Sequence, residues 1–498
     1  MKMGHRVRSG TAVAVIVVLV AALSAIAMIH TATLSRADVC ADAGARQFEA
    51  VGGCAGAPDA VPPPEYVPPP PEYPALPPRA PKNIHPRANP GIHPATNAVW
   101  STTDPSNPQQ TLPSGDSGNV HWEVGTYESD NLLIYGLICY PASAGPHPVL
   151  IVNHGSAPGV STVPGMPPGI VTATWNGCIT MAENGWVVAT STYRGWSIFG
   201  TQPGEQAPLP YQGFTRLSEG QFELCGGEVD DVLNLLSAVK ALPNDVAKAN
   251  QVVMYGHSHG SCITELAIER GAAPQIAVSV DGPTDFTQTA SWTWGGLLPQ
   301  TSPGPAYPGG PVWCPSCGST FHAQEYARSS ALSDTSIGKN GPSFLAKVSF
   351  LRIHDEGDGI VAPQHGCELA GALGPGSSNY FLYPDTSPPG TYFAPPKECG
   401  QWLPNPCYAD KTGSHCGPWK LGRLLPDTGK GGPWTSPTFL MYACPQSVCT
   451  GPDRSPTGNE GAAEHGLILN QSWPEVASFV NQFASGWSAT FPAQFPFE

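Results

Sequence analysis

The feature that most constrains the fold is an alternation of short apolar runs with segments of helical periodicity. Runs of strand length lie at 148–153, 186–193, 251–255, 275–280, 346–354 and 379–383. Helical spacing is found at 228–242, 261–270, 365–373 and 474–484. Buried strands separated by helices are typical of a mostly parallel, doubly wound sheet. The sequence therefore predicts an α/β fold, opened by two further strands at 119–127 and 132–140.

Sequence composition divides the 498 residues into three parts. Residues 1–37 combine early basic residues, an apolar run at 11–29 and the small residues Ser35 and Ala37, which is typical of a signal peptide or a signal anchor. Residues 38–98 are rich in proline and are expected to form a disordered linker. The catalytic domain is then expected at 99–498.

Two stretches interrupt the alternation within 99–498. Residues 283–345 are rich in Gly, Pro, Trp and Ser and are interpreted as a cap insert, and residues 384–462 as a Cys-rich insert. The 14 cysteines all follow the apolar N-terminal run, which favours disulfides in an exported chain. The sequence thus predicts a secreted or cell-surface protein, with a possible cell-envelope or membrane tether through the N-terminus.

Charge excludes one class of partner. The formal net charge is −15 and only 12% of the residues are charged. A nucleic-acid-binding protein needs a basic face, so no nucleic-acid partner is expected.

The segment at 251–262 reads QVVMYGHSHGSC, a predicted strand followed by G-x-S-x-G and a predicted helix. This context is that of a nucleophile elbow, in which a strained strand-to-helix turn exposes a serine. The flanking Gly256 and Gly260 fit it, because only small residues are accommodated two positions on either side of the serine. Ser258 is therefore the candidate nucleophile.

A serine nucleophile needs a base and an orienting acid, which in this kind of fold follow it along the chain. Asp355, Glu356 and Asp358 come after the predicted strand at 346–354 and are the candidate acids. His465, placed between the last strand and the last helix, is the candidate base, with His415 as its competitor.

Two backbone amides are expected to form the oxyanion hole. One belongs to His259, which follows the nucleophile. The other belongs to Ser156, in the loop IVNHGS after the strand at 148–153. WCPSC at 313–317 lacks the setting of a redox or zinc motif, so no metal and no cofactor are predicted.

These motifs resemble those of the α/β-hydrolases of the dienelactone hydrolase and prolyl-oligopeptidase type. PHPVLIVNHGS is similar to their oxyanion strand, YRGWSIFG to the following loop, GHSHGS to their elbow, and RIHDEGDGIVAP to their acid segment, of the form H-G-x-x-D-x-x-V-P. Aligning His354 and Val361 with that form selects Asp358 over Asp355. The resemblance covers roughly 119–280, 346–383 and 463–487.

The chain departs from these relatives at several points. Asp355 replaces the glycine after His354, histidines flank Ser258, and dienelactone hydrolases use cysteine as the nucleophile. We expect no β-propeller before the predicted domain, because the residues between the apolar run and residue 99 are mostly the proline-rich linker.

The resemblance implies a serine hydrolase with the triad Ser258, Asp358 and His465. The expected substrate is a small-molecule or polymer carboxylic ester. The alternatives are a serine peptidase of the prolyl-oligopeptidase type and a non-catalytic cell-surface protein on a hydrolase fold.

Overall fold

The structure is a computed structural model. It describes residues 98–155, 168–196, 216, 218–220, 225–285, 331, 342–358, 360–373, 377–382, 408–410, 413–415, 434–444 and 460–497. All of them belong to one compact unit, Ala75–Glu498. Residues 1–37, nearly all of the linker and most of both expected inserts lie outside the described residues, so the predicted domain boundaries stay predictions.

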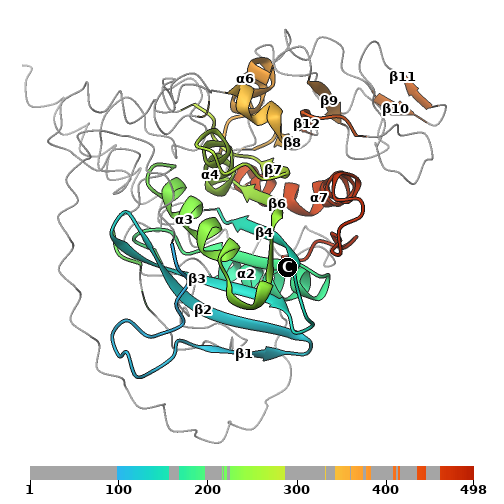
Figure 1. Ribbon diagram of the computed structural model, residues 1–498. Helices are drawn as coiled ribbons and strands as arrows, with labels where there is room; N and C mark the ends of the chain where they lie inside the picture. The colour runs from blue at the N-terminus through green and yellow to red at the C-terminus, as the bar shows by residue number, and fades with distance from the viewer. Residues whose placement is uncertain are drawn as a thin grey trace, which may run out of the picture. The chain divides into compact units, whose positions relative to one another are not determined.

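A ten-stranded sheet forms the centre of this unit (Figure 1). In spatial order its strands are β1 (Ser114–Ser117), β2 (Val120–Ser129), β3 (Leu132–Pro141), β5 (Val187–Ser191), β4 (His147–Asn153), β6 (Ala247–His257), β7 (Ile276–Val280), β8 (Ser349–Asp355), β12 (Thr438–Tyr442) and β9 (Ser378–Leu382). The pairs from β1 to β5 are antiparallel, and those from β5 to β9 are parallel. A separate hairpin pairs β10 (Tyr408–Asp410) with β11 (Gly413–His415).

Helices cover both faces of the sheet, as a doubly wound fold requires. They are α2 (Pro168–Glu183), α3 (Glu228–Lys240), α4 (His259–Glu269), α6 (Gln364–Leu373) and α7 (Glu460–Phe483). The mostly parallel α/β-hydrolase fold expected from the sequence is confirmed. Among the described residues, no helix is long and apolar enough to cross a membrane.

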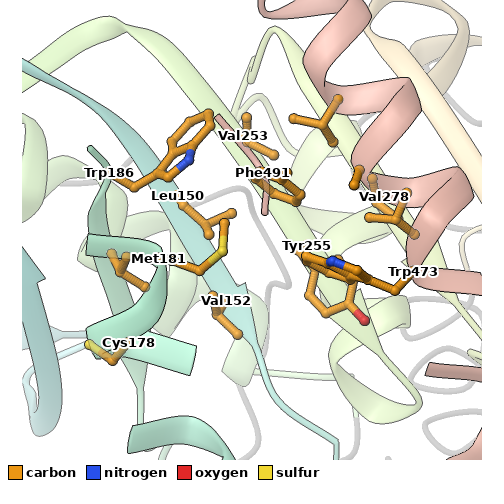
Figure 2. Packing of buried hydrophobic residues seen from close by; sticks show 14 of the residues in the cluster. Leu150, Val152, Cys178, Met181, Trp186, Val253, Tyr255, Val278, Trp473 and Phe491 are labelled. Carbon is orange, nitrogen blue, oxygen red and sulfur yellow. The ribbon is translucent and has the colours of Figure 1, made fainter. Parts of the chain in front are cut away.

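The core consists of two clusters, one on each face of the sheet, because successive side chains of the central strands point to opposite faces. In β4, Leu150 and Val152 pack with residues of α2 and α7, whereas Val149 and Ile151 pack with residues of α3 and α4. Successive side chains of a strand point to opposite faces, so both faces of β4 are covered. Figure 2 shows the first cluster, in which Met181 of α2 and Trp473 of α7 lie near Leu150 and Tyr255.

Several elements differ from the sequence expectation, which did not include the short strands β1, β10 and β11. The helix α2 and the strand β12 were not predicted, and β12 pairs with β8 and β9 inside the range expected to be the Cys-rich insert. The last helix begins at Glu460 instead of Pro474, with Pro474 inside it. Proline is tolerated best in the first turn of a helix, but the buried Ile468, Trp473 and Val476 lie on both sides of Pro474 in this one helix.

All described cysteines take part in disulfides. Cys139 of β3 is joined to Cys178 of α2 at an S–S distance of 2.07 Å. Cys225, which precedes α3, is joined to Cys262 in the first turn of α4. The expectation that the cysteines form disulfides is thus confirmed for the cysteines that the structure describes.

Candidate active site

Ser258 occupies the sharp turn between β6 and α4. Its backbone has φ 56° and ψ −123°, a strained conformation for a residue other than glycine. A Cβ on Gly256 would lie 2.1 Å from the carbonyl oxygen of Gly260, and one on Gly260 would lie 1.9 Å from that of Asn153. The turn therefore admits only glycine at these positions, as the motif requires.

His465 and Asp358 meet at the carboxyl edge of the parallel strands. His465 lies in the first turns of α7, and its Nδ1 is 2.7 Å from Oδ2 of Asp358. Asp358 follows β8, and its Oδ1 accepts hydrogen bonds from the amides of Ile360 and Val361 at 2.7 and 2.9 Å. The carboxylate is thus fixed by the backbone and directed at the imidazole.

The other candidate acids contact the backbone. Oδ1 of Asp355 accepts a hydrogen bond from the amide of Gly357 at 2.5 Å, and Oε2 of Glu356 accepts one from the amide of Cys444 at 3.1 Å. The structure therefore separates Asp358 from its two neighbours by its contact with His465. The competing base, His415, ends β11, and its side chain lies outside the described residues.

Ser258 and His465 are not hydrogen-bonded to each other. The Nε2 atom of His465 is buried and has no hydrogen-bond partner among the described residues. The two residues are linked through His257, whose Nε2 donates to the backbone oxygen of His465 at 2.9 Å. Such sites often tighten only when substrate binds, so this arrangement is compatible with proton transfer.

The loop after β4 lies against the nucleophile. A Cβ on Gly155 would be 3.1 Å from the Cβ of Ser258. Ser156, the expected second oxyanion donor, lies outside the described residues. The first expected donor, His259, opens α4, where backbone N–H groups have no acceptor within the helix.

Burial keeps the histidines of the site neutral. It lowers the pKa of His465 below its ordinary 6.5, while an ionised Asp358 opposes that change. Burial and the nearby His465 lower the pKa of His257 to about 3. Burial and His154 lower the pKa of His259 as well, and its Nε2 accepts a hydrogen bond from the amide of Cys225 at 3.1 Å. A neutral His465 can accept a proton from a serine hydroxyl.

Sequence reasoning missed Asp281. This residue follows β7, the strand next to the nucleophile strand, and its Oδ2 lies 4.0 Å from Nδ1 of His465. Its side chain is fully buried and its φ is 48°. The available signal was an acidic residue directly after the buried run at 275–280, because the carboxyl ends of parallel strands lie at one edge of a sheet.

Three sets of side chains in the described part have metal-ligand types within 4.8 Å of one another. They are Cys225, His259 and Cys262; His257, Asp281 and His465; and Asp281, His354 and Asp358. The disulfide occupies both thiols of the first set. In the other two sets, His465 contacts Asp358 and His257 contacts the backbone oxygen of His465. His354 Nε2 lies 3.0 Å from the backbone oxygen of Val361.

The α/β-hydrolase fold thus brings a serine on a strained turn and a His–Asp pair to one edge of its sheet. Solved structures similar to the chain include an acylaminoacyl peptidase from Pyrococcus horikoshii, at 15% identity and a TM-score of 0.34, with 51% of this chain and 35% of that chain covered. Porphyromonas gingivalis dipeptidyl peptidase 4 has 19% identity and a TM-score of 0.34, with coverages of 51% and 30%.

Prolyl oligopeptidase B from Galerina marginata is similar at 21% identity and a TM-score of 0.33, with 51% of this chain and 31% of that chain covered. The chain thus spans about a third of the length of these proteins. A scan against family models and a search of curated protein sequences found no match.

Proposed function

We propose that this chain hydrolyses carboxylic esters through an acyl-enzyme on Ser258. The observation that carries the proposal is the pairing of His465 Nδ1 with Asp358 at 2.7 Å at the edge of the sheet where Ser258 stands on its strained turn. Acyl transfer requires a nucleophile, a base and an orienting acid, and Ser258, His465 and Asp358 are of the residue types that supply them.

The proposed reaction has two steps. The Ser258 hydroxyl attacks the ester carbonyl while His465 Nε2 takes its proton, and His465 then gives that proton to the departing alcohol. Water repeats the sequence on the acyl-enzyme and releases the acid. Asp358 holds Nδ1 protonated, so that Nε2 is the accepting nitrogen. The amides of His259 and Ser156 are the proposed donors to the oxyanion.

An ester is favoured over a peptide by the chemistry of the leaving group. An alkoxide or phenoxide leaves with less help from a general acid than an amine does. Burial lowers the pKa of His465, so its ring is neutral and available to accept a proton, but it is a weaker base and its imidazolium is less stable. A peptide bond remains the alternative substrate, because the same triad cleaves amides in serine proteases. No metal or organic cofactor takes part in this proposal.

Labelling with a fluorophosphonate tests the nucleophile without knowledge of the substrate. The wild type should be labelled on Ser258 and Ser258→Ala should not. Ser143→Ala is a matched control, because Ser143 is exposed and precedes β4 at the opposite edge of the sheet. An unlabelled but folded wild type would support the non-catalytic alternative.

A substrate panel separates the ester from the peptide alternative. The panel compares p-nitrophenyl acyl esters with aminoacyl and prolyl anilides at matched concentrations. We expect a higher kcat/KM on at least one ester than on every anilide. The reverse order would assign the chain to the peptidases.

We also propose that the chain is exported and acts in the cell envelope or outside it. The disulfides of the described cysteines support this proposal, because such bonds persist in oxidising compartments. Sequencing of the mature N-terminus tests it. Cleavage should leave Asp38 as the first residue. A retained apolar segment in the membrane fraction would indicate a signal anchor, and a cytoplasmic protein with free thiols would contradict export.

A further inference from the structure

Two carboxyl groups face the same nitrogen of His465. Asp281 follows β7 and Asp358 follows β8, which are neighbouring parallel strands. Both side chains are fully buried. Oδ2 of Asp358 lies 2.7 Å from Nδ1 of His465, and Oδ2 of Asp281 lies 4.0 Å from it. The two carboxyls are close enough to hydrogen-bond each other when one of them carries a proton.

The hydrogen-bond donors around the two carboxyls are unequal. Asp358 accepts from two amides, those of Ile360 and Val361, and faces the imidazole N–H of His465. Asp281 accepts from one amide, that of Asp355, at 2.8 Å through Oδ1. Its Oδ2 is buried with no hydrogen-bond donor among the described residues. The surroundings therefore stabilise Asp358 as the carboxylate and leave Asp281 as the natural holder of a proton.

Among the described residues, the cation that acts on both carboxyls is Arg352, which lowers the pKa of each. The titratable groups near the pair are Tyr255 and His257 from β6, Arg352 and His354 from β8, and His465 from α7. Arg352 already pairs with Glu265 at 2.6 Å. Burial and Arg352 lower the pKa of His354, so that ring is neutral. Two adjacent buried carboxylates would then repel each other, and the pair keeps one proton.

We propose that Asp281 is a positioning residue of the active site, a neutral carboxylic acid whose O–H donates a hydrogen bond to the Asp358 carboxylate. The proposal deepens the proposed function and rests on it. The hydrogen bond holds Asp358 toward Nδ1 of His465 and spreads its negative charge over two carboxyl groups. The imidazolium that forms during the reaction therefore meets one shared negative charge. No proton leaves Asp281 in the cycle.

Two substitutions of Asp281 separate a neutral donor from an ionised acid. Asp281→Asn keeps an N–H donor beside Asp358 and removes the acidic proton. Asp281→Ala removes the donor. We expect the asparagine variant to keep fluorophosphonate labelling and ester hydrolysis within about threefold of wild type, with the same acid limb in the pH profile. The alanine variant should lose roughly 10- to 100-fold in kcat, the range of one hydrogen bond to a charged group. Its acid limb should move to higher pH.

Opposite results would overturn the proposal. A loss of 10³ or more in Asp281→Asn would show that Asp281 works as a carboxylate, because removal of a charged triad acid costs about that much or more. A wild-type rate and pH profile in Asp281→Ala would show that Asp281 positions nothing.

Infrared difference spectra test the proton on Asp281 even if the alanine variant does not fold. The wild-type minus Asp281→Asn spectrum at neutral pH should contain the C=O stretch of one protonated carboxylic acid, and its absence would contradict the proposal. This reading does not depend on activity. A wild type that shows the band but is not labelled by the fluorophosphonate would refute the proposed function. It would still support a proton shared by Asp281 and Asp358.

Discussion

His257 joins the nucleophile elbow to the helix that carries the base. Its Nε2 donates a hydrogen bond to the backbone carbonyl of His465 at 2.9 Å, and the two imidazole rings lie 4.7 Å apart between their centroids. Because His257 directly precedes Ser258, this bond fixes how far the start of α7 lies from the nucleophile. The histidine that departs from the family pattern thus has a structural role at the site.

His257→Phe should lower kcat while the fold is kept. The phenyl ring preserves the ring contact but cannot donate to the His465 carbonyl. One such hydrogen bond contributes about 1 kcal/mol, so we expect a loss of roughly 5- to 10-fold in kcat and in the labelling rate. His121→Phe, on β2, is the control and should leave both rates unchanged. An unaltered labelling rate in His257→Phe would contradict the role of the bond.

Asp358→Asn should lose far more activity than Asp355→Asn. The asparagine amide at 358 would present N–H groups to Nδ1 of His465 and favour the wrong tautomer, a change that costs of order 10⁴ in kcat in one serine protease. Asp355 contacts the amide of Gly357, so its loss should affect the loop more than the reaction. Steady-state kinetics on one ester measure both. Equal losses would mean that the acid is wrongly assigned.

Gly260→Ala should destabilise the elbow, whereas Gly466→Ala should not. The new methyl at 260 would lie 1.9 Å from the Asn153 oxygen, which is backbone and cannot move aside, but nothing lies within 4 Å of a Cβ at 466. Gly466 lies inside α7, where alanine is favoured by about 0.5–1 kcal/mol. Thermal unfolding and labelling would check the pair. A Gly260→Ala protein as stable and reactive as wild type would exclude the close approach.

The two disulfides with both partners described offer a matched comparison, since their sequence separations are 39 and 37 residues. Similar loop lengths predict similar losses of stability, about 2–4 kcal/mol, when either pair is replaced by serines. Only the Cys225–Cys262 pair should also slow labelling, because the amide of Cys225 donates to the ring of His259, the first residue of α4. Equal labelling rates in the two double variants would contradict this link.

The sequence predicted the elbow well because its determinants are local. The strand at 251–255, the two glycines and the helix after Ser258 adjoin one another along the chain. The parallel strands were readable because burial on both faces leaves uninterrupted apolar runs. The resemblance of the segment from His354 to Val361 to the acid segment of the prolyl-oligopeptidase type pointed to Asp358, and His354 Nε2 lies 3.0 Å from the Val361 oxygen in the same segment.

Features that depend on distant contacts were not readable. The strand β12 is short and lies in a cysteine-rich stretch, and only its pairing with β8 and β9 defines it. The helix α2 contains glycines and threonines, which favour helices weakly, and is held by the packing of Cys178 and Met181. The approach of Asp281 to His465 joins residues that are far apart in sequence, and the sequence gives no distance between them.

The pH dependence of the free energy of unfolding should show whether native Asp281 carries a proton. Burial and the adjacent Asp358 raise the pKa of Asp281 well above its ordinary value, so the native state keeps a proton that the unfolded chain releases above about pH 4. The free energy of unfolding of wild type should therefore fall with rising pH, by up to about 1.4 kcal/mol per unit relative to Asp281→Asn, until the native pKa is reached. At low pH, where both states are protonated, this contribution is absent. Urea unfolding of the two proteins at pH 4.5, 5.5 and 6.5 measures the difference, which should grow in favour of the variant. If the free energies of unfolding of the two proteins changed equally over this pH range, Asp281 would be ionised in the native protein.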